Sequence, residues 1–162
     1  MKPTYQKLKQ NYYSSNKAAS NFVDGEVLYS EIGYSQEALM KQNPAYENTC
    51  ATRVSLALLK SGVSFTGRLI IKSGELKGKA VETGAKLLAD QLMRPTVFGR
   101  PEVYKPADFM KRVTDKRGVV FFWKITGYGG GHIDLIEILN TVAVCNSNCF
   151  IHSKEIWFWE LK

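Results

Sequence analysis

The last third of the chain constrains the fold most, because its strand-like segments follow one another without an intervening helix. Residues 118–125, 132–138, 142–145 and 156–161 are rich in β-branched and aromatic side chains, which favour strands. Residues 139–141 are predicted to form a tight turn between the second and third of these strands. Helix-like segments precede this region, so the order of elements predicts an α+β protein in which N-terminal helices pack on a C-terminal antiparallel sheet.

Helical spacing is clearest at residues 48–62, where apolar side chains recur on one helix face and Gly62 provides a stop. Asn48 or Thr49 can serve as the N-cap, which places Cys50 in the first turn of this helix. The other expected elements are a partly helical layer at 1–34, helices at 35–41, 83–93 and 105–113, a strand with a basic loop at 63–80, and a connection at 94–104.

Length and composition predict a single folded domain over residues 1–162. An apolar content of 44% is enough for a hydrophobic core, and no run approaches the roughly 20 apolar residues of a membrane span. The first residues lack the apolar run of a secretory signal peptide, so any export is expected to use a different route.

The net charge of +7 predicts attraction to an anionic partner. The basic residues are scattered and are not interleaved with aromatic ones, a pattern that argues against nucleic acid. The anionic bacterial cell wall is the other candidate that fits this charge.

Three cysteines leave one of them without a partner. Cys145 and Cys149 can form a short disulfide loop only if the chain turns between them, because an extended strand would hold their Cα atoms roughly 13 Å apart. A disulfide would indicate an oxidising compartment, and two free thiols in the cytosol are the alternative. No second pair of Cys or His has the spacing of zinc ligands, so no metal or other cofactor is expected.

Cys50 remains as a candidate nucleophile, because a helix N-terminus favours the thiolate form that attacks carbonyl groups. A thiolate of this kind needs a base, and the chain has two histidines. His132 follows three glycines, which let a substrate backbone come close, whereas His152 lies among surface-like residues. A helix with the nucleophile and a strand with the histidine give the papain-like arrangement of a cysteine peptidase or amidase.

A third polar group should orient the histidine ring. With a three-residue turn at 139–141, Asn148 lies across the hairpin from His132, and with a shorter turn Ser147 takes that place. The orienting residue is therefore expected among Asn146, Ser147 and Asn148, with Asn148 favoured, or is Asp134 on the same strand face as His132.

Simpler interpretations of the same residues remain open. Cys50 can be a small buried side chain, Asp134 a polar strand residue, and Arg53 a solvated helix residue.

Three motifs in order resemble those of a known family. Asn48-x-Cys50-x-x-Arg53-x-Ser55 resembles the nucleophile helix of the fourth family of type VI secretion amidase effectors. The segment Gly131-His132-Ile133-Asp134-Leu135 looks like the histidine strand of that family, and Cys145-x3-Cys149 is similar to its disulfide loop. Segment 63–105 matches only loosely.

The resemblance implies an NlpC-like fold and hydrolysis of the amide between D-glutamate and meso-diaminopimelate in peptidoglycan stem peptides. It also implies injection by a type VI secretion apparatus into the periplasm of a rival cell, and a cognate immunity protein that blocks the site. The family has an aspartate in the Cys-x3-Cys loop as third catalytic residue. This chain differs there, because its loop is Asn146-Ser147-Asn148.

In the expected mechanism His132 takes the Cys50 proton, and the backbone N–H of Cys50 helps to hold the oxyanion. Two other functions compete with this one. The first is a cysteine deamidase or protease-type toxin that acts on a protein, and the second is a catalytically inert module that binds the cell wall.

Overall fold

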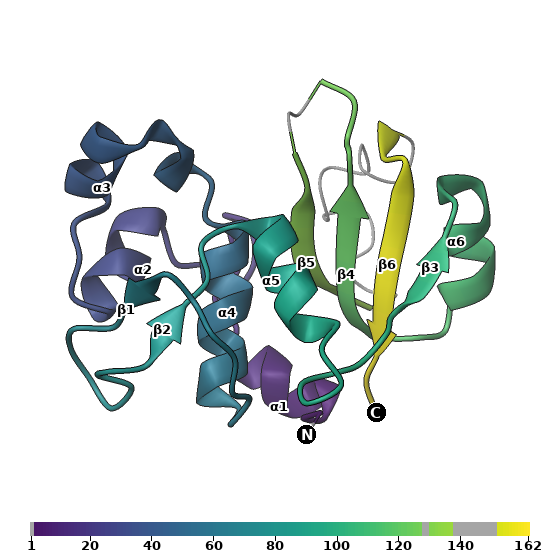
Figure 1. Cartoon of the computed structure of the whole chain (residues 1–162), viewed down its shortest axis with the longest axis horizontal. Coiled ribbons are helices and arrows are strands. Elements are labelled where there is room, and N and C mark those ends of the chain that lie inside the picture. The colour runs from purple at the N-terminus through teal and green to yellow at the C-terminus, as the bar shows by residue number, and fades with distance from the viewer. Residues whose placement is uncertain (1, 128–129, 138–151) are drawn as a thin grey trace.

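The computed structural model describes residues 2–127, 130–137 and 152–162, and Figure 1 shows how their helices and strands are arranged. The helices are α1 (Tyr5–Gln10), α2 (Gly25–Glu31), α3 (Gln36–Gln42), the 3₁₀ helix η1 (Pro44–Glu47), α4 (Cys50–Lys60), α5 (Ala85–Leu92) and α6 (Pro106–Val113). The strands are β1 (Leu69–Ile70), β2 (Ala80–Val81), β3 (Glu102–Tyr104), β4 (Gly118–Trp123), β5 (His132–Ile136) and β6 (Glu155–Glu160).

Four strands form the main sheet in the order β3-β6-β4-β5, and every neighbouring pair is antiparallel. The strands predicted at 118–125, 132–138 and 156–161 are confirmed as β4, β5 and β6, with ends that differ by a few residues. In β5, His132 pairs with Phe122 of β4. The predicted turn at 139–141 and strand at 142–145 lie outside the described residues.

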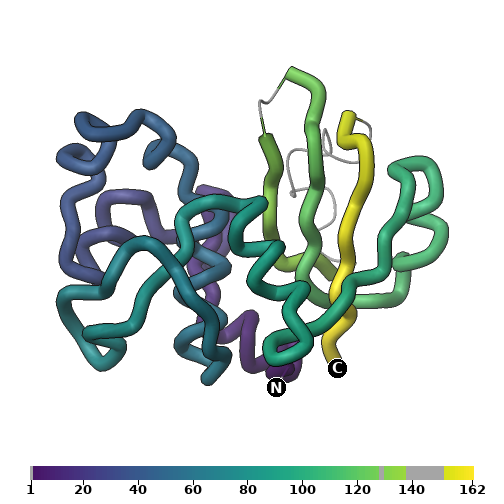
Figure 2. Tube along the Cα trace, viewed as in Figure 1, coloured from purple at the N-terminus to yellow at the C-terminus, as the bar shows by residue number. Residues whose placement is uncertain are grey.

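The sheet is covered on both faces, which explains why its strands do not alternate between apolar and polar residues. Val119 and Phe121 of β4 belong to the core cluster that also contains residues of α1, α4 and α5. Val120 and Phe122 belong to a second cluster that includes Phe109 of α6. Figures 1 and 2 place α5 and α6 on opposite sides of the strands.

Helix α4 lies between the sheet and the N-terminal helices (Figure 1), and all of its residues from Ala51 to Leu59 are buried. A helix that is buried all round belongs to the centre of a protein. Its end is the one expected at Gly62, which has a φ of 88°. The Gly62 N–H donates to the Leu59 carbonyl and the Val63 N–H to the Leu58 carbonyl, as in a Schellman motif.

The elements that sequence analysis missed include α2 and β3. Helix α2 lies in the segment expected to be only partly helical, yet the Asp24 side chain caps it by accepting from the Val27 N–H at 2.9 Å. Its Leu28 and Tyr29 pack in a third cluster with Leu56 of α4. Strand β3 lies in the predicted connection and gains its order from pairing with β6, a long-range contact that local propensity does not reveal.

No helix in the described part of the chain combines the length and the apolar character that a bilayer crossing requires.

Candidate active site

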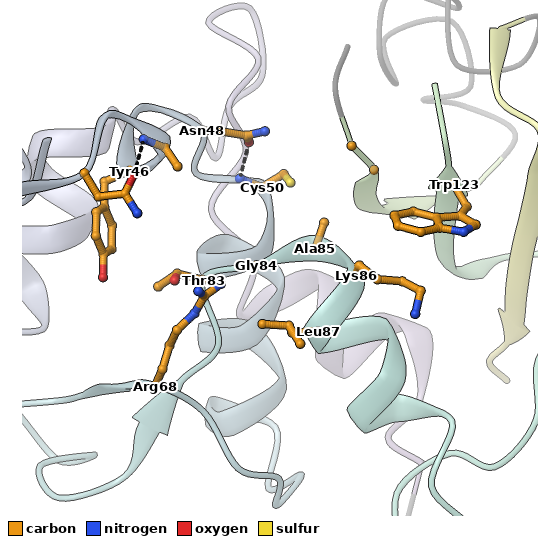
Figure 3. A pocket seen from close by; sticks show the side chains of 14 residues that line it. Tyr46, Asn48, Cys50, Arg68, Thr83, Gly84, Ala85, Lys86, Leu87 and Trp123 are labelled. Atoms are coloured by element: carbon orange, nitrogen blue, oxygen red, sulfur yellow. Dashed lines mark hydrogen bonds between the residues drawn. The ribbon is translucent and has the colours of Figure 1, made fainter. Parts of the chain in front are cut away.

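Cys50 begins helix α4 and lines a cavity of about 410 Å³. The thiol is free and half-buried. Figure 3 shows Cys50 at one side of this cavity, opposite Trp123 and above the start of α5. Among the residues that line it are Asn48, Cys50, Arg68, Gly84, Lys86 and Trp123.

Strand β5 brings His132 to the Cys50 side chain, with which its ring forms a hydrogen bond. The side chain of His132 is 13% exposed, and the ring stacks on Phe122 of β4 with the centroids 6.3 Å apart. The structure therefore joins two residues that sequence analysis selected from distant parts of the chain, and it does so by packing α4 against β5.

Asp134 holds the other side of the histidine ring. Its Oδ2 lies 2.9 Å from His132 Nε2. Its Oδ1 accepts from the Tyr12 hydroxyl at 2.8 Å and from the Leu135 backbone N–H at 2.8 Å. A carboxylate that is held at Oδ1 and bonded to the ring through Oδ2 restrains the plane of the imidazole.

The charges around His132 favour its protonated form. Burial is the largest single influence and by itself lowers the pKa of His132. The hydrogen bonds to Asp134 and Cys50 and the negative charges on them outweigh burial together, and they raise the pKa from 6.5 to about 10. An imidazolium between a carboxylate and a sulfur atom is the form that a thiolate nucleophile requires.

Tyr12 is a permanent donor to Asp134. Its side chain is buried, and burial together with the neighbouring Asp134 charge raises the pKa of this phenol well above its ordinary value. The hydroxyl therefore keeps its proton at any working pH and donates it to Oδ1.

Arg53 holds the segment after Tyr12 against helix α4. The simpler interpretation as a solvated residue is wrong, because Arg53 is 3% exposed. Its Nη1 donates to the backbone carbonyls of Tyr13, Ser14 and Val23, and its Nε donates to Thr49 Oγ1 at 2.8 Å. That bond occupies the Thr49 hydroxyl, so Thr49 stands at the N-cap position without capping the helix through its side chain.

The Cys50 backbone N–H, which was expected to hold the oxyanion, already donates a hydrogen bond to the Asn48 side chain. The Asn48 Oδ1 atom accepts from this N–H at 3.1 Å (Figure 3). This bond satisfies a donor at the exposed start of α4, and a substrate oxyanion would have to replace it.

A family model described as type VI secretion system (T6SS), amidase effector protein 4, matches residues 46–159. The match spans most of the chain and includes both Cys50 and His132. The chain belongs to this family. The prediction of an antibacterial effector that is a peptidoglycan amidase is confirmed at that level.

Solved structures of this family have the same fold as this amidase effector. The Tae4 effector from Enterobacter cloacae in complex with Tai4 gives a TM-score of 0.64 at 19% identity, over 100% of both chains. The Enterobacter cloacae effector alone gives 0.64 at 20% identity, over 100% of this chain and 98% of that one. The Salmonella typhimurium Tae4/Tai4 system gives 0.61 at 18% identity, over 100% of both chains. These likenesses confirm the α+β, NlpC-like fold. A search of curated proteins found no match.

Several predicted site residues of this effector cannot be compared with the geometry. Asn146, Ser147 and Asn148, together with the Cys145–Cys149 pair, lie outside the described residues. Their roles stay predictions. His152 is exposed. Within the described ranges, no group of three or more His, Cys, Asp or Glu side chains is arranged to hold a metal ion.

Sequence analysis missed three residues that shape the site of this effector. Tyr12 lies far from Asp134 in the chain, and nothing in its local sequence points to that contact. Arg68 was part of a segment assigned only a strand and a basic loop. Lys86, whose Nζ lies 5.2 Å from the centroid of the Trp123 ring, was one cation among many.

Proposed function

We propose that this effector hydrolyses the γ-D-glutamyl–meso-diaminopimelate amide of peptidoglycan stem peptides with Cys50 as nucleophile and His132 as acid and base. The observation that supports the proposal most is the chain of contacts from Asp134 through His132 to Cys50 at the edge of the cavity. In a family of amidase effectors, that arrangement suits acyl transfer to sulfur.

The first half of the reaction forms a thioester. The Cys50 thiolate adds to the γ-glutamyl carbonyl, and the carbonyl oxygen takes the negative charge. As the carbon–nitrogen bond breaks, the His132 imidazolium gives its proton to the departing amine of diaminopimelate. The glutamyl group is left on sulfur and His132 is neutral.

The second half returns the enzyme to its starting state. Neutral His132 takes a proton from water, whose oxygen adds to the thioester carbonyl. The carbon–sulfur bond then breaks and restores the thiolate beside an imidazolium, and the released glutamate carboxylic acid loses its proton to the solvent. Asp134 orients the ring in both halves, and Asn148 stays a prediction for the same role.

The oxyanion is held by the Cys50 backbone N–H once the Asn48 carbonyl has moved away. A half-turn of the Asn48 carboxamide would present its NH₂ group in place of its oxygen. Asn48 would then become a second donor to the same oxyanion.

The relatives support a proposal for the partners and the place of action. Solved structures of relatives pair the effector Tae4 with the immunity protein Tai4. By analogy, a cognate immunity protein binds this effector, and a type VI apparatus delivers it to the periplasm of the recipient, where residues 1–162 act as one amidase domain.

The test is digestion of purified Gram-negative peptidoglycan with the wild type and with Cys50→Ala, followed by mass spectrometry of the released muropeptides. New fragments that end in glutamate are expected from the wild type. The variant should be at least about a thousandfold slower, because removal of a nucleophile abolishes its covalent step.

Two results would contradict the proposal. Equal cleavage by Cys50→Ala would exclude Cys50 as the nucleophile. An absence of new fragments from a folded wild type would favour a protein substrate or a module that only binds the wall.

A further inference from the structure

We propose that Arg68 binds the free α-carboxylate of the glutamate residue whose side-chain amide is cleaved. The inference rests on the proposed function and deepens it, because it names the substrate group that this wall of the cavity recognises. It predicts that the effector distinguishes stems with a free glutamate carboxylate from stems in which that group is amidated.

Arg68 lies on the wall of the cavity that also holds Cys50. It directly precedes β1, and its side chain extends toward Thr83 and Gly84 at the start of α5 (Figure 3). The Nε atom donates to Glu82 Oε1 at 2.8 Å, while the Arg68 side chain remains 50% exposed. One edge of the guanidinium is therefore anchored to the protein.

The anchor of Arg68 is itself fixed to the nucleophile helix. Glu82 is 6% exposed, and its Oε1 also accepts from the Gly84 backbone N–H at 3.0 Å. The Glu82 backbone N–H donates to Ser55 Oγ of α4 at 2.9 Å. These bonds set the position of the guanidinium relative to the helix that begins at Cys50.

Gly84 leaves the space in which the guanidinium lies. A Cβ atom added at this position would lie 2.3 Å from Arg68 Nη2. The backbone of Gly84 has a φ of −104°, which any residue can adopt. The backbone conformation at Gly84 therefore permits an alanine, but the added methyl group would displace the Arg68 side chain.

The remaining donors of Arg68 are available to a ligand. Within the described part of the chain, neither terminal nitrogen of Arg68 donates to a protein group. The other cation of the cavity, Lys86, is held by both oxygens of Asp90 at 2.8 and 2.9 Å. The described residues that line the cavity include no carboxylate, so no acidic side chain of this lining opposes an anionic group.

The proposed substrate supplies the matching anion. A glutamate linked through its side chain keeps a free α-carboxylate only a few bonds from the scissile carbonyl. A guanidinium with two parallel N–H donors binds a carboxylate in a bidentate manner, and a neutral carboxamide cannot reproduce that pairing.

The experiment compares two synthetic stem peptides, L-Ala-γ-D-Glu-meso-diaminopimelate and the same peptide with D-isoglutamine. The wild type should cleave the free acid with a kcat/KM roughly 10- to 100-fold higher, the range expected for hydrogen bonds to a charged group. In Arg68→Gln the preference should disappear through a higher KM for the acid. The rate on the amidated peptide should remain the same and serve as a measure of folding.

Two further variants separate this role from a general effect of charge. Gly84→Ala keeps the arginine but displaces its guanidinium, so it should reduce the preference as well, and it tests the role even if Arg68→Gln does not fold. Lys86→Gln removes a charge from the same cavity and should leave the ratio between the peptides unchanged.

Three outcomes would overturn the assignment. Equal cleavage of both peptides by the wild type would leave the proposed function intact and refute the role of Arg68. The role of Arg68 would also be refuted if Lys86→Gln lost the preference while Arg68→Gln and Gly84→Ala kept it. Cleavage of neither peptide by an enzyme with reactive Cys50 would refute the proposed function and, with it, this inference.

Discussion

At the scale of single residues, the active site depends on a hydrogen bond that starts in the N-terminal segment. Tyr12 donates to Asp134, Asp134 contacts His132, and His132 contacts Cys50. Each member limits the rotation of the next, so a buried hydroxyl group can control how His132, the proposed base, meets Cys50, the proposed nucleophile.

Replacement of Tyr12 by phenylalanine tests this dependence. We expect kcat to fall roughly tenfold with little change in KM, because the loss of one hydrogen bond to a charged group loosens Asp134 and the ring it holds. A second measurement is the rate at which iodoacetamide alkylates Cys50, followed by mass spectrometry of the Cys50 peptide. The ratio of the rate at pH 6 to the rate at pH 9 should be lower in Tyr12→Phe than in the wild type. The His132 imidazolium, which its raised pKa preserves at both pH values, would no longer be held against the sulfur.

Tyr29→Phe is the matched control for this change. It removes another buried hydroxyl contact of 2.8 Å, in this case to Thr52, and has no bond to Asp134. The ratio of alkylation rates should stay at the wild-type value in Tyr29→Phe. An unchanged ratio in Tyr12→Phe as well would show that Asp134 holds its position without the phenol.

At the scale of elements, helix α4 is defined at its end by Gly62. Gly62→Ala should lower the free energy of unfolding by about 1 kcal/mol, because an L side chain is disfavoured at a φ of 88°. Urea denaturation monitored by circular dichroism measures the change. Gly62→Asn should cost less, since asparagine tolerates the left-handed region, and equal costs would argue for a packing effect of the side chain.

The elements also show what the sequence could predict. The helix with Cys50, the strand with His132 and the stop at Gly62 follow from local spacing and residue type. The strand β3 and the contact between Tyr12 and Asp134 depend on partners far along the chain. The sequence left a solvated Arg53 open because an arginine in a helix is usually exposed, whereas here three backbone carbonyls accept from it.

At the scale of the whole molecule, Arg53 joins the N-terminal layer to the central helix. Arg53→Met should lower the free energy of unfolding by about 2–4 kcal/mol, because it leaves the carbonyls of Tyr13, Ser14 and Val23 without this donor. Equilibrium denaturation in urea tests the value. Arg94→Met, at an exposed position, should change stability by less than about 0.5 kcal/mol; a similar loss in both variants would mean that charge, not the buried contacts, is responsible.

The order of the site residues along the chain has a consequence for biosynthesis. Tyr12 and Cys50 leave the ribosome early, whereas His132 and Asp134 emerge late, and β6 must follow before β4 gains both of its neighbours. A nascent chain that ends at β4 carries Cys50 without His132, its proposed base. The effector is therefore expected to remain latent during translation and to acquire its activity only after β6 has been made.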